Sequence, residues 1–167
     1  MARDTLEAAL DLAARVEVAG GAVALAIDSL AVRYGRFPPV VARGGVEVRG
    51  GAITLDGLEL STAGSRLTAN GVVEGARGAR LVLALDPLDL ADAHAATGAA
   101  LLEQAGWVRG TAALDGEWRN LELSIALNAE RGRDRIDSLV ARGRFTPAAV
   151  EIERLALSVN GVPFRGS

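Results

Sequence analysis

Aliphatic residues recur at every second position through most of this chain. In residues 22–86 and again in residues 107–165, Leu, Val, Ile and Ala alternate with polar residues in runs that end at glycine. Since neighbouring residues of a strand point to opposite faces, this period of two predicts strands with one apolar face. The density of Gly-containing turns predicts that about ten such strands form an antiparallel sheet.

Two segments instead show helical spacing. In residues 3–15, Leu6, Leu10, Ala13 and Ala14 favour a helix that ends at a glycine pair. Residues 89–105 favour a second helix, closed by Gly106. The sequence therefore predicts a mainly β fold, a curved antiparallel sheet with an N-terminal helix and a short central helix.

Composition limits the domain organisation and the chemistry. The 167 residues suffice for a single domain, 1–167, and 50 % hydrophobic residues argue against disorder. A net charge of −3 argues against nucleic-acid binding. All 18 basic residues are arginine and cysteine is absent, which excludes Schiff-base lysines, disulfides and thiolate sites. The longest apolar stretch, residues 19–27, is about half a membrane span.

Glycine recurs after an apolar, spacer, apolar, spacer pattern at Gly50, Gly71, Gly143 and Gly161, so we expect each of these glycines to lie on the apolar face of its strand. Glycines placed regularly within strands allow a sheet to bend, so we expect the apolar face to be concave.

The phase of the alternation slips at several points. At Asp56-Gly57 and at Asp115-Gly116, a tight hairpin and a bulge remain equally good interpretations. At Glu153-Arg154, where there is no glycine, a bulge is favoured.

The polar candidates favour structural roles over catalysis. His94 is the only histidine, and the acidic run at residues 86–92 lacks the glycine and closing glutamate of a calcium loop. Asp89 as a helix cap, with Asp92 in the first turn, explains the run more simply. We therefore expect no catalytic residue, no metal and no cofactor.

Three other groups invite a functional interpretation and favour a structural one. Residues 71–78 precede a strand, so they predict a hairpin rather than a nucleotide loop. Trp107 and Trp118 favour filling the end of a sheet. Five arginines are interleaved with acidic residues, which favours a solvated hairpin over a polyanion site: Arg131, Arg133, Arg135, Arg142 and Arg144.

The apolar stripes leave two architectures open. About ten apolar strand faces meet only two short helices, so either the sheet closes as a barrel or sandwich, or it leaves a groove for an apolar ligand. The groove would be lined by Leu81, Leu83, Leu85, Leu121, Leu123, Ile125, Leu127, Val150 and Ile152.

The order of three motifs resembles the AsmA-like superfamily and, within it, the TamB-type translocation and assembly proteins. They are GAITLDGLELSTAGSRLTANGVV at residues 51–73, LVLALDPLDLA at 81–91 and GWVRGTAALDG at 106–116. The resemblance covers about residues 20–165. It rests on the order of short strand patterns rather than on catalytic signatures.

The resemblance implies a long curved sheet with an apolar groove, in a periplasmic protein anchored in the inner membrane of a diderm bacterium. It implies a role in carrying phospholipid to the outer membrane and in outer-membrane protein assembly. This chain lacks the anchor and is far shorter, so we expect a segment of a longer protein; without the resemblance, a cytoplasmic location is expected.

The resulting expectation is a non-catalytic module that holds phospholipid acyl chains. The alternative is an assembly module that binds strands of client outer-membrane proteins by β-augmentation. An enzyme would require the carboxylates of residues 86–92 to work with His94.

Overall fold

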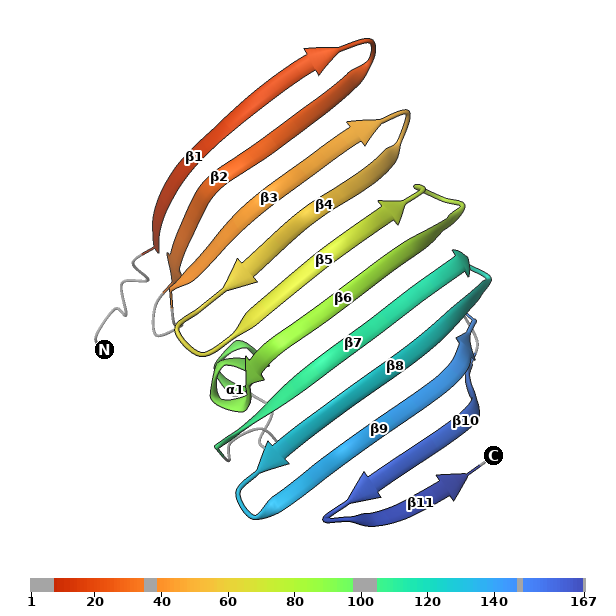
Figure 1. Ribbon diagram of the computed structural model, residues 1–167. Helices are drawn as coiled ribbons and strands as arrows, with labels where there is room; N and C mark the ends of the chain where they lie inside the picture. Colours follow the sequence, from red (N-terminus) through yellow and green to blue (C-terminus); the bar gives the residue numbers. More distant parts are fainter. Residues whose placement is uncertain (1–7, 35–38, 98–104, 147–148, 167) are drawn as a thin grey trace, which may run out of the picture.

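The computed structural model describes residues 8–34, 39–97, 105–146 and 149–166. Within them, eleven strands form one antiparallel sheet whose spatial order is the order of the chain (Figure 1). The strands are β1 (Ala8–Ala19), β2 (Ala22–Tyr34), β3 (Val40–Arg49), β4 (Ala52–Ser61), β5 (Arg66–Val73), β6 (Gly78–Asp89), β7 (Gly106–Glu117), β8 (Asn120–Arg131), β9 (Asp134–Phe145), β10 (Val150–Val159) and β11 (Val162–Gly166). One helix, α1 (Leu90–Thr97), lies between β6 and β7.

The sheet is open. β1 and β11 form its two edges and are not paired with each other, so the strands do not close into a barrel. The described strands belong to this one sheet, and α1 packs against β6 and β7. The mainly β, curved antiparallel fold expected from the alternation is confirmed, and the open arrangement excludes the closed barrel.

The predicted N-terminal helix is wrong over the described residues. Residues 8–15 belong to β1, while residues 3–7 lie outside the part of the chain that the structure describes. Gly20 and Gly21, with φ of 57° and 77°, form the two-residue turn that folds β1 back onto β2. The alternation from Leu12 to Val18 then pairs with β2, and this pairing outweighs the helical spacing of Leu10 and Ala14.

The central helix is confirmed but shorter than residues 89–105. It begins at Leu90, after the cap residue Asp89, whose Oδ1 accepts a hydrogen bond from the N–H of Ala91 at 2.8 Å. The helix is described to Thr97, and residues 98–104 lie outside the described part. β11 lies at the end of the stretch 107–165 in which strands were predicted, and it follows the turn at Asn160 and Gly161, both with positive φ.

Bulges explain the slips in the alternation. Asp56-Gly57 lies inside β4, where the pairing with β5 jumps from Leu55 to Leu58, so of the two interpretations left open the bulge is correct. The N–H of Gly57 donates to Oδ1 of Asn70 at 2.8 Å on the facing strand. Because a bulge inserts one extra residue, the aliphatic residue after it faces the same side of the sheet as the aliphatic residue before it. Without the bulge, that residue would face the opposite side.

The other two slips have different outcomes. Asp115-Gly116 lies within β7, paired with β8, and the chain turns only after Glu117. The predicted bulge at Glu153-Arg154 is confirmed, because the pairing of β10 with β9 jumps from Ile152 to Arg154.

The glycines of the recurrent pattern divide into two kinds. Gly71 and Gly143 lie inside β5 and β9, whereas Gly50 and Gly161 occupy hairpin turns rather than the apolar face. The expectation that all four belong to the apolar face is therefore wrong. Gly71 has φ +133°, and a Cβ there would lie 2.0 Å from the carbonyl oxygen of Arg80 on β6.

A polar cluster ties α1 to the turn between β4 and β5. The carboxylate of Asp92 accepts hydrogen bonds from the hydroxyls of Thr62 and Ser65, the latter at 2.6 Å. The Ser65 hydroxyl in turn accepts the N–H of Asp89 at 2.9 Å. This cluster fixes the start of the helix against the end of the sheet.

Gly71→Ala should destabilise the sheet, because the added Cβ meets the β6 backbone and the φ angle is strained for any L-residue. We expect the free energy of unfolding to fall by about 1–3 kcal/mol in chemical denaturation followed by circular dichroism. Gly166→Ala is the control, because nothing lies within 4 Å of its Cβ position. Equal midpoints for the two variants would contradict the close packing at Gly71.

Asp92→Ala should loosen α1, because it leaves the Thr62 and Ser65 hydroxyls without their carboxylate acceptor. We expect a loss of about 1–3 kcal/mol in the free energy of unfolding. Asp115→Ala, which removes an exposed ion pair with Arg80, should cost less than about 1 kcal/mol. If Asp115→Ala lowers the free energy of unfolding more than Asp92→Ala in the same denaturation assay, the polar cluster around Asp92 does not anchor α1.

Candidate functional site

The register of the sheet places aliphatic side chains in continuous rows across it. Residues that pair across an antiparallel ladder share a face, so the pairing can be followed from strand to strand. One row contains Val16, Leu25, Val46, Leu55, Gly71, Leu81, Leu114, Leu123, Gly143 and Ile152. Another contains Leu12, Leu30, Ala42, Leu60, Leu67, Leu85, Gly110, Leu127, Leu139, Leu157 and Phe164.

Two further rows belong to the same surface. One contains Val18, Val23, Val48, Ile53, Val73, Ala79, Gly116, Leu121 and Phe145. The other contains Leu58, Ala69, Leu83, Ala112, Ile125, Ala141 and Leu155. We call the surface formed by these four rows the apolar face.

The apolar face has no hydrogen-bonding side chain. Its members are Ala, Val, Leu, Ile and Gly, with Phe145 and Phe164 as the two aromatic residues. The opposite face carries the charges: a row through Thr54 and Arg80 continues to Asp115 and Glu122. The Nε of Arg80 lies 3.2 Å from the Oδ1 of Asp115. The two faces are therefore chemically distinct across the whole sheet.

The predicted lining residues lie together on the apolar face. Leu81 pairs with Leu114, which pairs with Leu123; Leu83 shares its row with Ile125. The register places these eight in the rows above: Leu81, Leu83, Leu85, Leu121, Leu123, Ile125, Leu127 and Ile152. Val150 pairs with Phe145 and so continues the row of Leu121, although its side chain lies outside the described part.

Much of the apolar face is accessible. Val16, Val18 and Ile152 are 63 %, 74 % and 61 % exposed, whereas Leu121 at the start of β8 is 2 % exposed. Among the described residues, the buried hydrophobic side chains are four alanines and two leucines: Ala22, Ala42, Ala69, Ala79, Leu90 and Leu121. The large side chains thus form no conventional core and remain available for contact.

Some members of the apolar face were missed by the sequence prediction. Leu12 on β1 was assigned to a helix, Val16 and Val18 were left out, and Phe164 on β11 lay in the stretch predicted to form strands but was not assigned to a face. A signal was present in each case: strict alternation before Gly20-Gly21, and a valine and a phenylalanine two residues apart after Asn160-Gly161.

Asp89 and Asp92 make structural contacts. Asp89 caps α1 as predicted, and Asp92 accepts hydrogen bonds from the β4–β5 turn. His94 lies in α1 and is half-buried. No group of three or more metal-ligating side chains occurs in the described ranges. Residues 74–77 form the predicted hairpin between β5 and β6, with the N–H of Glu74 donating to the Gly78 carbonyl.

The five arginines singled out from the sequence do not form one cationic site. Arg131 and Arg133 lie at the β8–β9 turn, and Arg135 is 3.1 Å from Asp137. Arg142 and Arg144 lie further along β9, where a guanidinium nitrogen of Arg144 is 3.4 Å from a Glu153 oxygen. Acidic residues are interleaved with them, as expected for a solvated polar face.

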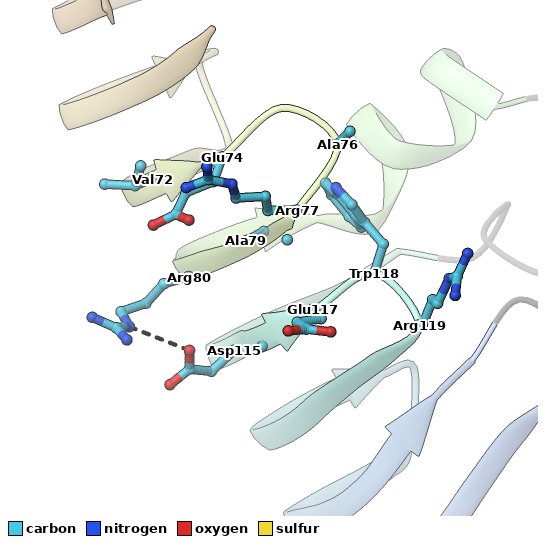
Figure 2. A pocket seen from close by; sticks show the side chains of 12 residues that line it. Val72, Glu74, Ala76, Arg77, Ala79, Arg80, Asp115, Glu117, Trp118 and Arg119 are labelled. Carbon is cyan, nitrogen blue, oxygen red and sulfur yellow. Dashed lines mark hydrogen bonds and ion pairs between the residues drawn. The ribbon is translucent and has the colours of Figure 1, made fainter. Parts of the chain in front are cut away.

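The two tryptophans lie at opposite ends of β7. Trp107 at the start of β7 lies beneath the Arg109 guanidinium, 5.2 Å from the ring centre. Trp118 reaches across to the β5–β6 turn, where its Nε1–H donates to the Gly75 carbonyl at 2.7 Å (Figure 2). The prediction that such residues fill a sheet end is confirmed for Trp118.

A shallow cavity of about 580 Å³ opens beside Trp118 (Figure 2). Three arginines and three acidic residues line it together with the tryptophan: Glu74, Arg77, Arg80, Asp115, Glu117 and Arg119. Because the charges of its rim balance, the cavity has no preference for an anion or a cation. The apolar face therefore remains the candidate functional site.

Comparison with known proteins finds no relative. No protein family, curated protein or solved structure matches the chain. In the described residues no helix has the length and hydropathy needed to cross a membrane.

Proposed function

We propose that this chain is a non-catalytic lipid-handling module whose apolar face holds phospholipid acyl chains. One observation carries the proposal: rows of aliphatic side chains run across the sheet without a single hydrogen-bonding group, and no second layer of described strands covers them. A ligand that lies on such a surface must itself need no hydrogen bonds, and a hydrocarbon chain meets that requirement.

The dimensions suit acyl chains. Eleven strands spaced about 4.8 Å apart give a face about 50 Å long. The hydrocarbon of one bilayer leaflet is about 15 Å thick, half of the membrane core. The face is therefore long enough for more than one acyl chain in succession along the sheet.

The composition of the face favours lipid over a folded protein partner. Protein interfaces concentrate Tyr, Trp and Arg and contain about one hydrogen bond per 100–200 Å². The rows defined above have none of these residues and no side-chain donor or acceptor. Contact by the hydrophobic effect alone, at about 0.8 kcal/mol per buried methylene, is non-directional. A lipid can then move between equivalent positions without breaking a specific bond.

The resemblance to the AsmA-like superfamily extends the proposal. It assigns the module to a TamB-type protein of the periplasm, anchored in the inner membrane, that moves phospholipid between the inner and outer membranes. The open sheet and its continuous apolar face support this assignment.

Photo-crosslinking tests which face meets lipid. Leu123 and Ile125 belong to the apolar face, whereas Glu122 and Ser124 belong to the opposite one. A photo-reactive residue at Leu123 or Ile125, in purified chain mixed with phospholipid vesicles, should capture phospholipid. The same residue at Glu122 or Ser124 should capture little. Equal capture from both faces would count against the proposal.

A charge on the apolar face should remove lipid binding while the sheet stays folded. In Ile125→Asp the carboxylate repels acyl chains, and an open sheet lets water reach it. We expect lost phospholipid binding with a strand-rich circular dichroism spectrum retained. Ser124→Asp is the matched control on the opposite face and should bind lipid normally. If Ile125→Asp unfolds the chain and wild type captures no lipid, the apolar face is an ordinary core.

A further inference from the structure

The two edges of the sheet differ in how readily they accept another strand. β11 has five residues and pairs with residues 155–159 of β10. Because Val159 and Val162 flank a two-residue turn, the nitrogen of the next residue, Pro163, faces outward. Proline has no N–H to offer, and the part of β10 beyond β11 contains the bulge at Ile152. Both features hinder strand addition.

The β1 edge has neither feature. β1 is 12 residues long, contains no proline and has none of the described strands on its outer side. Ala19 and Ala22 flank the Gly20-Gly21 turn, so the backbone groups of Val18 and of every second residue before it point away from β2. The register shift between these strands places the extra residue, Asp28, in β2. β1 therefore presents an uninterrupted row of donors and acceptors.

The charges of β1 favour a second copy of β1 as the added strand. In an antiparallel pair, outward-facing residues must meet outward-facing residues, so the two residue numbers sum to an even number. A pair centred on Ala13 overlaps residues 8–18 of both copies. By two-fold symmetry it places Asp11 opposite Arg15 twice.

Neighbouring registers are worse. A pair centred on Ala14 sets Asp11 against Glu17, and one centred on Arg15 sets the two arginines against each other. A pair centred on Leu12 is shorter and places no opposite charges across from each other. Opposite charges directly across a ladder stabilise it and like charges destabilise it. A pair centred on Val16 also sets Arg15 against Glu17 but overlaps only residues 13–19, so charge and length together select the register centred on Ala13.

The surroundings of β1 accommodate this pair. The Arg15 guanidinium is 3.1 Å from Asp28, but the two side chains are 77 % and 52 % exposed, so a second carboxylate can reach it. The two-fold axis lies perpendicular to the sheet, which keeps both apolar faces on one side. Leu12, 55 % exposed, then lies opposite Ala14 of the second copy.

We propose that two copies of this chain associate through their β1 edges into one continuous sheet with one continuous apolar face. The proposal is independent of whether that face binds lipid, because it rests on the backbone edge and on the charges of Asp11 and Arg15.

Sedimentation velocity of the purified chain over a range of concentrations tests the association. Wild type should show a monomer–dimer equilibrium. Asp11→Arg turns both cross-strand pairs into Arg–Arg contacts and should raise the dimer dissociation constant at least about tenfold. The double variant Asp11→Arg/Arg15→Asp restores opposite charges and should recover dimerisation relative to the Arg15→Asp single variant. In both of these variants residue 15 is an aspartate that faces Asp28 of its own copy. The difference between their dissociation constants therefore reports only the contact between residues 11 and 15 of the two copies.

Two proline variants test the edge itself. Val16→Pro removes an outward N–H of β1 and should weaken the dimer, whereas Arg165→Pro, at an outward position of β11, should not. Ile125→Asp, on the apolar face, should also leave dimerisation unchanged.

Three results would overturn the proposal. They are a monomer at every concentration, a dimer unaffected by Asp11→Arg and Val16→Pro, and a dimer dissociated by Ile125→Asp. The last would mean that the copies stack through their apolar faces.

Discussion

The separation of aliphatic and polar side chains onto the two faces of a single layer governs this structure. A sheet normally buries its apolar face against a second layer. Here the described residues supply one sheet and one short helix, and large aliphatic side chains such as Val18 stay exposed. The backbone ladder and contacts between neighbouring strands hold the sheet together. Exposing the apolar face to water is unfavourable, and this cost is removed only when an apolar partner covers the face.

Keeping this separation over eleven strands requires that the phase of the alternation be corrected. In β2, β4, β6 and β10 the spacing of aliphatic residues changes from two to three, as between Leu85 and Leu88, and each change coincides with a register shift. Without the bulge, the rest of the strand would turn its aliphatic residues to the polar face. Glycine at positions such as Gly71 lets the backbone of the neighbouring strand approach closely. Bulges and glycines thus keep one face continuous.

Much of this was predictable because the period of two is a local signal. The strands after Ala22 and the grouping of Leu81, Leu123 and Ile125 on one face follow from alternation and from strands pairing in chain order. The β1 error arose because its alanines have a high intrinsic helix propensity, which the pairing with β2 overrides. Asp56-Gly57 was ambiguous because the same dipeptide suits a hairpin and a bulge, and the partner Asn70 is distant in sequence. Whether the sheet closes depends on contacts between strands at opposite ends of the chain, which local patterns do not encode.

The central claim is that the apolar face is open and binds acyl chains, and native mass spectrometry of the purified chain tests it most directly. The account predicts species heavier than the chain by the mass of one or more phospholipids, whether the chain is one copy or two. Those adducts should be lost from Ile125→Asp and kept in Ser124→Asp. A chain that is free of lipid after purification and takes up none from phospholipid vesicles would contradict the account.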